Sequence, residues 1–170
     1  FQGAATGTFV TTPNANTVNN LIVNRSAGVT LSQNIAVAGN LIFTSGNLIS
    51  TTSNLLSITN TSTSAISGAS SSSFINGPVK WTLPSSLGSG STYVFPIGKG
   101  SAYLPFSLVN PTTGTGTVTA LVEAFAANPG GSFDATLESI STTEYWSLAT
   151  TGNFTNSSIS LDRSIPNDPL

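Results

Sequence analysis

Short apolar runs recur between residues 20 and 58, and each of them follows an asparagine. The runs are 21–23, 41–43, 48–49 and 55–56, and Ser, Thr and Gly separate them. Leu21 and Leu41 lie 20 residues apart, and so do Ile35 and Leu55. A repeat of this length that is carried by short strands is typical of a solenoid.

The repeat predicts a parallel β-helix over residues 17–77. Stacking 21–23 on 41–43 puts like residues at like depth in successive rungs, about 4.8 Å apart. Gly39-Asn40 and Gly46-Asn47 are expected at corners, because Gly and Asn tolerate a positive φ. Asparagines at 40, 47 and 54 are also seven residues apart, which leaves an antiparallel meander as the alternative. The predicted strands are 18–23, 29–31, 34–37, 40–44, 47–50, 54–59 and 73–75.

A Ser-rich tract at residues 62–73 interrupts this pattern. Its composition is that of a linker. Apolar residues at 65–66 and 74–75 border it, however, so we interpret it as one wide turn of the last rung. The segment then holds about three rungs, near the minimum for a solenoid, and its open ends need covers.

After Asn76-Gly77-Pro78 the pattern changes to alternating strands. Segment 120–127 also has the composition of a short helix, but its Thr-Val-Thr start favours a strand. Regular turns between the strands predict an antiparallel β-sandwich-like module over residues 78–170, truncated at its C-terminus. Residues 1–16, with a strand at 7–11, are expected to continue from an upstream element. The predicted strands are 79–83, 92–97, 104–109, 116–126, 143–148 and 158–161, with turns at 98–100, 110–114 and 128–131.

The predicted fold class is therefore all-β: short parallel β-helix rungs followed by an antiparallel β-sandwich-like domain. Charged residues make up 6% of the chain, against about 25% in ordinary soluble domains. A solvent face built from hydroxyls and amides favours an extracellular or cell-surface location. The chain has no Cys, so it has no disulfides and no thiol chemistry.

The charges that are present argue against two classes of partner. Phosphate binding needs clustered Lys and Arg, and the chain has a net charge of −2 with scattered Arg25, Lys80, Lys99 and Arg163. No nucleic acid is therefore expected. No apolar run approaches the roughly 20 residues of a membrane-spanning helix, so membrane insertion is not expected either.

Four motifs of the second half carry a resemblance to a known kind of module. They are Asn-Gly-Pro-Val-Lys-Trp at 76–81, Phe-Pro-Ile-Gly-Lys-Gly at 95–100, Tyr-Leu-Pro at 103–105 and Glu-Tyr-Trp-Ser-Leu at 144–148. With the preceding rungs, residues 17–161 resemble modules of large secreted or cell-surface proteins of Bacteroidota. Such proteins are often exported by the type IX secretion system and include adhesins and gliding-motility filaments. The resemblance implies export and a multi-module parent chain, and it implies no catalytic residues.

The chain offers little catalytic chemistry. It has no His, which removes Ser-His-Asp and Cys-His machinery. The carboxylates share no motif that would pair them for glycoside cleavage. Asp162, Asn167 and Asp168 bring oxygen ligands for Ca²⁺ without a D-x-D-x-D-G pattern. We therefore predict no catalytic, metal-binding or cofactor-binding residues and no enzyme. The carboxylates are Glu123, Asp134, Glu138, Glu144, Asp162 and Asp168.

Three other groups of residues are candidates for a functional role. Gly98-Lys99-Gly100 lacks the spacing of a phosphate loop and is expected in a β-turn. Lys80 and Lys99 are candidates for a covalent bond to an Asn or Asp side chain. The aromatic residues form either a sugar-stacking platform or, more commonly on alternating strands, core packing. They are Trp81, Tyr93, Tyr103, Tyr145 and Trp146.

The preferred hypothesis is a non-catalytic structural and adhesive module of a long extracellular bacterial surface protein or filament. Its expected partners are neighbouring modules of the same chain or like subunits, with surface glycans as a further partner. The alternative is a carbohydrate-binding accessory module of a secreted polysaccharide-degrading enzyme. A β-helix lyase is a third hypothesis, which the missing His and the short solenoid oppose.

Overall fold

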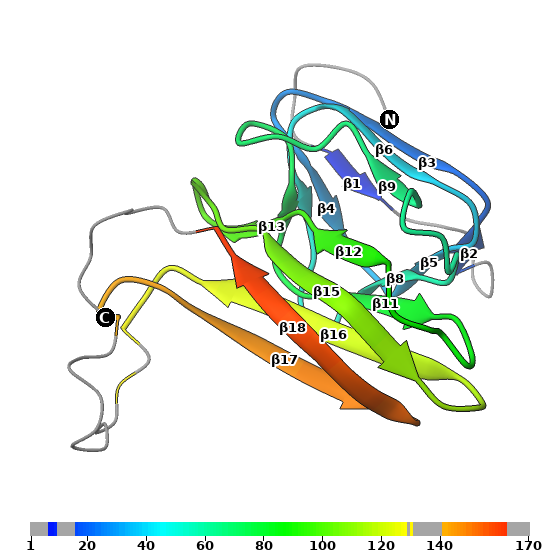
Figure 1. The fold of residues 1–170 in the computed structure, drawn as a ribbon. Coiled ribbons are helices and arrows are strands. Elements are labelled where there is room, and N and C mark those ends of the chain that lie inside the picture. The colour runs from blue at the N-terminus through cyan, green and yellow to red at the C-terminus, as the bar shows by residue number, and fades with distance from the viewer. Residues whose placement is uncertain (1–6, 10–15, 129, 131–140, 163–170) are drawn as a thin grey trace.

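The computed structural model describes residues 7–9, 16–128, 130 and 141–162. These residues form strands β1 to β18 and no helix, so the described chain is all-β. Within the same part of the chain, no helix has the length and the apolar character to cross a membrane. The parallel part lies toward the N-terminus and the antiparallel part toward the C-terminus (Figure 1).

Three sheets wind the first half of the chain into a β-solenoid of about four turns. Successive rungs visit sheet C, then sheet A, then sheet B, and all pairs between rungs are parallel. Sheet A holds β3 (Leu21–Asn24), β6 (Leu41–Ser45) and β9 (Ile66–Ser67). Sheet B holds β1 (Gly7–Phe9), β4 (Val29–Leu31), β7 (Leu48–Ile49), β10 (Ile75–Asn76) and β13 (Ile97–Lys99). The parallel strands of sheet C are β2 (Thr17–Val18), β5 (Ile35–Val37), β8 (Leu56–Ile58) and β11 (Val79–Leu83).

The register confirms the 20-residue step at one place and corrects it at another. Leu21 pairs with Leu41, as predicted, and the next two residues pair with Ile42 and Phe43. Ile35, in contrast, pairs with Leu56 and not with Leu55. Farther along, Leu41 pairs with Ile66. Rung length varies because the loops at the corners differ in length, whereas the inward-facing positions stay aligned. Parallel pairing also excludes the antiparallel meander for these strands.

The corner asparagines are placed by hydrogen bonds and not by a positive φ. Among the described non-glycine residues, only Ser86 and Asn110 have a positive φ. Asn20 Oδ1 instead accepts a hydrogen bond from the backbone N–H of Asn40, one rung later, at 2.8 Å. Asn47 Oδ1 accepts one from the Phe74 N–H at 3.0 Å. The asparagine at the head of a strand therefore links two rungs. Its position at the corner follows from this hydrogen bond and not from tolerance of a positive φ.

The Ser-rich tract belongs to a rung, as the preferred interpretation had it. Ala65 is fully buried, and the tract contains β9, a strand that the sequence pattern did not predict. Farther on, Ser70 and Ser73 exchange two backbone hydrogen bonds and close a tight turn before β10. The linker alternative is therefore wrong.

The second half is antiparallel and extends the sheets of the solenoid. Sheet C continues from β11 into β16 (Val118–Phe125) and then β17 (Tyr145–Thr151), both antiparallel to their neighbours. A fourth sheet, sheet D, holds β12 (Thr92–Phe95), β15 (Phe106–Thr113) and β18 (Phe154–Leu161). A short strand, β14 (Ala102–Tyr103), closes sheet B beside β13. The predicted strand at 116–126 is confirmed, and its helical alternative is wrong.

One predicted turn is wrong. Residues 110–114 were expected to form a turn at Pro111, but β15 runs through to Thr113. A register shift against β18 between Val109 and Thr112 absorbs the irregularity, and Asn110 takes a φ of 52° there. A bulge of this kind tolerates a proline because the ladder is locally unpaired.

The core is continuous between the two halves. Trp81 of β11 meets Tyr93 and Phe95 of β12 edge to face, with ring centroids 5.3 and 5.2 Å apart. Phe95 in turn meets Phe106 of β15 at 6.0 Å. These rings fill the space between sheets C and D, and they belong to the same apolar cluster as Leu21 and Leu41. The fold class is thus a β-solenoid joined to an antiparallel β-sandwich-like part.

The expected module boundary at Gly77-Pro78 does not interrupt the sheets. β11 pairs with β8 in sheet C, and β13 pairs with β10 in sheet B. Sheets B and C therefore each pair a strand that precedes Gly77-Pro78 with a strand that follows it. The division of the chain into residues 1–16, 17–77 and 78–170 stays a prediction.

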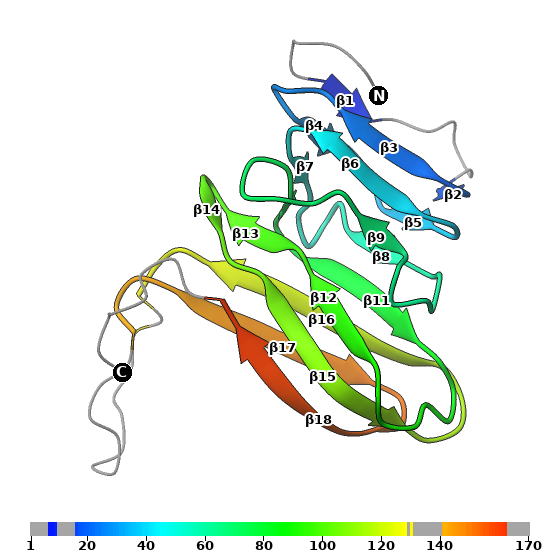
Figure 2. The same cartoon turned by 45° about the horizontal axis from the view of Figure 1, so that its top comes forward.

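The strand directions reveal a layer that the sequence pattern did not. β16 is antiparallel to β11, and β17 is antiparallel to β16, so β17 runs in the direction of β11. By the same steps through β15, β18 runs in the direction of β12. The consecutive strands β17 and β18, which lie in different sheets, thus follow the path of a solenoid rung, and Figure 2 shows them at the end of the molecule opposite β1, β2 and β3.

Candidate functional site

Two of the five candidate aromatic residues are core residues. Trp81 and Tyr93 are 0% and 1% exposed. The indole N–H of Trp81 donates to the backbone carbonyl of Asn60 at 2.8 Å. The hydroxyl of Tyr93 donates to the carbonyl of Thr61 at 2.7 Å. Both side chains hold the chain just before the wide turn against the sandwich, so the core-packing interpretation is confirmed for this pair and the sugar-stacking alternative is wrong.

Two further aromatic residues are half-buried and committed to packing. The Tyr145 ring stacks on the Phe125 ring of the neighbouring strand, with centroids 4.4 Å apart and planes 5° apart. The indole N–H of Trp146 donates to the carbonyl of Leu104 at 3.0 Å. Tyr145 and Trp146 are consecutive on one strand and therefore point to opposite faces of sheet C. The predicted residues do not form one platform.

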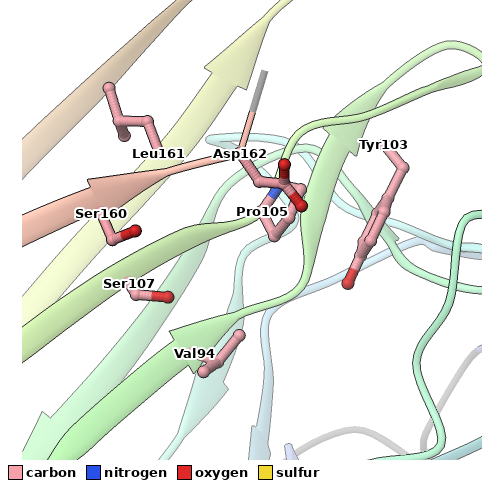
Figure 3. Close-up of a pocket in the computed structure, with 7 residues that line it drawn as sticks. All are labelled: Val94, Tyr103, Pro105, Ser107, Ser160, Leu161 and Asp162. Atoms are coloured by element: carbon pink, nitrogen blue, oxygen red, sulfur yellow. The ribbon is translucent and has the colours of Figure 1, made fainter. Parts of the chain in front are cut away.

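Tyr103, the fifth aromatic residue, lines a hollow of about 410 Å³ (Figure 3). The floor is a row across the outer face of sheet D, because Val94 pairs with Ser107 and Ser107 pairs with Ser160. The Tyr103 ring forms one wall and packs against Phe74 at 5.4 Å. Residues Pro105, Leu161 and Asp162 complete the lining.

The hollow presents hydroxyl groups and one carboxylate. Among the described residues, the hydroxyls of Tyr103, Ser107 and Ser160 have no hydrogen-bond partner. Burial raises the pKa of Tyr103, and the negative charge of Asp162 raises it further. Tyr103 is therefore a neutral donor near neutral pH, beside a carboxylate acceptor. Free hydroxyls, an acceptor and an aromatic wall match the hydroxyls and apolar faces of a neutral sugar better than they match an anion.

The predicted turn at Gly98-Lys99-Gly100 is found where β13 ends. Gly100 has a φ of 63°, and the segment does not open a helix. Lys99 Nζ lies 2.9 Å from Glu123 Oε1 on β16, and it lies over the Phe125 ring at 5.4 Å. Lys99 is therefore an ion-pair partner that joins sheet B to sheet C, and its neighbour is a glutamate rather than an Asn or Asp.

The carboxylates that the structure describes are not gathered into one site. Glu123 pairs with Lys99, Glu144 is buried at 2% exposure, and Asp162 borders the hollow. In the described part of the chain, no three Asp, Glu, His or Cys side chains are grouped to hold a metal ion. Asp134, Glu138, Arg163, Asn167 and Asp168 lie outside the described residues.

Sequence reasoning found Tyr103 and Asp162 but did not bring them together. Ser107 and Ser160 had no sequence signal, because they and Val94 become neighbours only through the register of three strands. The one available hint was Val94, an apolar residue at a position where strand alternation predicts a solvent-facing side chain.

The chain was compared with protein-family models, with curated proteins and with solved structures, and none of the three comparisons finds a match.

Proposed function

We propose that this chain is a non-catalytic structural and adhesive module of a long extracellular bacterial surface protein or filament. The observation that carries the proposal is the continuity of sheet C, which runs from β2 through β11 to β17. One hydrogen-bonded sheet thus joins the solenoid to the sandwich. A module built in this way transmits force along its stack without relying on a flexible linker.

The surface chemistry supports the same proposal. Charged residues are scarce, and Ser, Thr and Asn side chains cover the outside of the rungs. Several of these side chains bond from rung to rung, for example Ser45 Oγ to Asn24 Oδ1 at 3.0 Å. The polar surface therefore stiffens the stack.

Immunogold labelling of producing cells tests the proposed location and form. Antibodies against the 170-residue chain should label intact cells without permeabilisation, along filaments or the outer surface. An antibody against a cytosolic protein is the control and should label only permeabilised cells. Label confined to the cytosol, or an intact parent protein that is compact by small-angle scattering, would contradict the proposal.

A second candidate function is favoured by the hollow at Tyr103. In this proposal the chain is a carbohydrate-binding accessory module, and a neutral sugar unit lies on the row Val94, Ser107 and Ser160. Asp162 and the Tyr103 hydroxyl would then bind sugar hydroxyls. The negative charge of Asp162 disfavours uronic-acid polymers.

NMR titration with a panel of neutral oligosaccharides tests this second function. Binding should be lost in Tyr103→Ala and weakened at least tenfold in Asp162→Asn. Tyr145→Ala is the matched control, because Tyr145 stacks on Phe125 and does not line the hollow. Equal effects of Tyr103→Ala and Tyr145→Ala, or an absence of binding across the panel, would exclude a sugar site here.

A further inference from the structure

The consecutive strands β17 and β18, here called the terminal layer, lie in different sheets and end the described part of the sandwich. Each has one edge that no described strand pairs with. β17 is the outermost strand of sheet C and pairs only with β16. β18 is the outermost strand of sheet D and pairs only with β15. A single short turn at Gly152-Asn153 joins them. Figure 1 shows β17 in orange and β18 in red, each at the edge of its sheet.

The inner face of the terminal layer is partly covered in the described structure, because Trp146 and Phe154 pack against the core, whereas three of its apolar side chains are exposed. Leu148 pairs with Val122, Ile159 with Leu108, and Leu161 with Phe106. Directly paired residues point to the same face of a sheet, so these three side chains face the space between sheets C and D. Their partners are at most 2% exposed, whereas Leu148, Ile159 and Leu161 are 38%, 56% and 39% exposed. Within the described sandwich the core is therefore closed between β11, β16, β12 and β15 and becomes accessible at the terminal layer.

The terminal layer also lacks the devices that keep sheet edges apart. Free edges of monomeric proteins carry charged side chains or prolines. Residues 145–161 contain no Asp, Glu, Lys, Arg or Pro. Two other exposed apolar side chains, Ile22 and Val94, lie between buried neighbours and therefore point outward. Among the exposed large apolar side chains of the described residues, those that face inward by register belong to the terminal layer.

A docking partner must match these two edges in length. β17 has seven residues and β18 has eight. The described part of the opposite end offers β2 with two residues and β3 with four, which would leave most of both edges unpaired. A second terminal layer matches both edges along their full length. Head-to-tail stacking of copies is therefore a poor match, and pairing of two like ends is a good one.

We propose that the terminal layer docks a second copy of this chain through a two-fold axis normal to sheets C and D. The axis places β17 beside β17 and β18 beside β18 of the second copy, antiparallel, as in the β16–β17 and β15–β18 pairs. Leu148, Ile159 and Leu161 of both copies then close one shared core. Self-pairing opposes no like charges, because residues 145–161 carry none. The inference deepens the proposed function, on which it rests, by naming the surface that joins like subunits.

Sedimentation equilibrium of the 170-residue chain gives the first test. A species of twice the chain mass of 17.3 kDa is expected at micromolar concentration. The double variant Leu148→Gln with Ile159→Gln puts amides into the closed core and should raise the dimer dissociation constant at least tenfold. The matched control is Ala149→Gln with Ser158→Gln. Ala149 follows Leu148 and Ser158 precedes Ile159, so both side chains point to the outer face of the sheets. The control should leave the dissociation constant within about twofold, because its amides stay in solvent.

Single-cysteine cross-linking tests the symmetry, because the chain has no cysteine of its own. Ser147→Cys, Ala149→Cys and Thr151→Cys lie along the outer face of β17. Near a two-fold axis a residue meets its own copy, so oxidation should cross-link at least one of these variants as a homodimer. Ser57→Cys, on sheet C of the solenoid, is the control and should remain uncross-linked.

Two results would overturn the proposal. One is a chain that is monomeric at several hundred micromolar with the near-ultraviolet circular dichroism of a packed core. The other is a dimer whose dissociation constant does not change in the double variant Leu148→Gln with Ile159→Gln, and which none of the three single-cysteine variants of β17 cross-links. A monomer that still labels the cell surface would remove the dimer and leave the structural module in place, so the two failures are distinguishable.

Discussion

At the scale of single residues, polar side chains in this chain work as connectors between rungs. Asn34 Oδ1 accepts a hydrogen bond from the Leu55 N–H at 2.8 Å, and Asn60 Nδ2 donates to the carbonyl of Gly39 at 3.0 Å. Tyr93 and Trp81 extend the same principle to the sandwich, because each donates to a carbonyl of the wide turn. The described structure leaves no buried side-chain N or O atom without a partner. Hydroxyls and amides therefore replace the salt bridges that a more charged protein would use.

Removing one connecting asparagine should destabilise the fold measurably. Asn47→Ala leaves the half-buried N–H of Phe74 without its acceptor and should lower the free energy of unfolding by about 1–2 kcal/mol. Asn54→Ala is the control: it heads the next apolar run, and its side chain has no hydrogen bond in the described structure. Urea unfolding measures the stability of both variants. An equal loss of unfolding free energy in Asn47→Ala and Asn54→Ala would contradict a role of Asn47 in linking rungs.

Tyr93→Phe should change stability in a pH-dependent way. At neutral pH the variant loses the hydrogen bond to Thr61 and about 1 kcal/mol. Burial raises the pKa of Tyr93, so its stabilising contribution is complete below the pKa of an unfolded tyrosine, about 10. That contribution is lost as the pH rises through the higher pKa of the folded state. The stability gap between wild type and variant should therefore shrink from pH 9 to pH 11 in urea titrations. A constant gap would show that Tyr93 titrates as it does in the unfolded chain.

At the scale of elements, alternation decides which face of each strand is buried. β16 is the clearest case: Val118, Ala120, Val122 and Ala124 are fully buried, and the residues between them are half-exposed. The same alternation continues into β17 by register, yet inward Leu148 and Thr150 stay exposed there because no described strand lies beyond them, whereas inward Trp146 is half-buried. The sequence pattern of a strand therefore determines which side chains face inward, and the neighbouring strands determine whether those side chains are buried.

Adjacent residues of β16 should respond very differently to truncation. Val122→Ala removes two methyl groups from the core and should lower the free energy of unfolding by roughly 2 kcal/mol. Leu121→Ala removes a larger side chain from the outer face and should cost less than about 1 kcal/mol. Chemical denaturation followed by tryptophan fluorescence gives both values. A larger loss for Leu121→Ala would contradict the assigned faces of the strand.

At the scale of the whole molecule, one core and one sheet join two architectures. Sheet C is parallel from β2 to β11 and antiparallel from β11 to β17, and β11 carries Trp81 at the junction. In this arrangement the sandwich covers one end of the solenoid core. The solenoid in turn offers the edge strand β11, with which β16 pairs. The described molecule has its open layers at β1, β2 and β3 on one side and at the terminal layer on the other.

The solenoid and the sandwich should unfold as a single unit. Leu48→Ala in sheet B and Leu108→Ala in sheet D remove fully buried side chains and should each lower the free energy of unfolding by about 2–5 kcal/mol. Both should shift the same transition with an unchanged m-value, whether circular dichroism or tryptophan fluorescence reports it. Two separated transitions, each moved by only one of the variants, would show that the halves fold independently.

Much of the fold follows from local sequence. The spacing of Leu21 and Leu41 predicts their stacking, and the alternation over 116–126 predicts β16, because both patterns have the period of one strand or one rung. The errors occur where a local signal competes with pairing. Pro111 indicates a turn, yet the partner strand carries β15 past it through a bulge. Ile66, inside a Ser-rich tract, forms a strand only because β6 lies beside it.

The sequence by itself determined an all-β chain with a short parallel solenoid, an antiparallel continuation and no recognisable catalytic motif, since composition and period carry that information. Tertiary structure decided everything that depends on register between distant strands. It buried Trp81 and Tyr93, gathered Val94, Ser107 and Ser160 into the floor of a hollow with Tyr103 and Asp162, and left Leu148 and Ile159 exposed on inward faces. The physical reason is that a strand's own pattern sets which side chains share a face, whereas hydrogen bonding to other strands sets what that face meets.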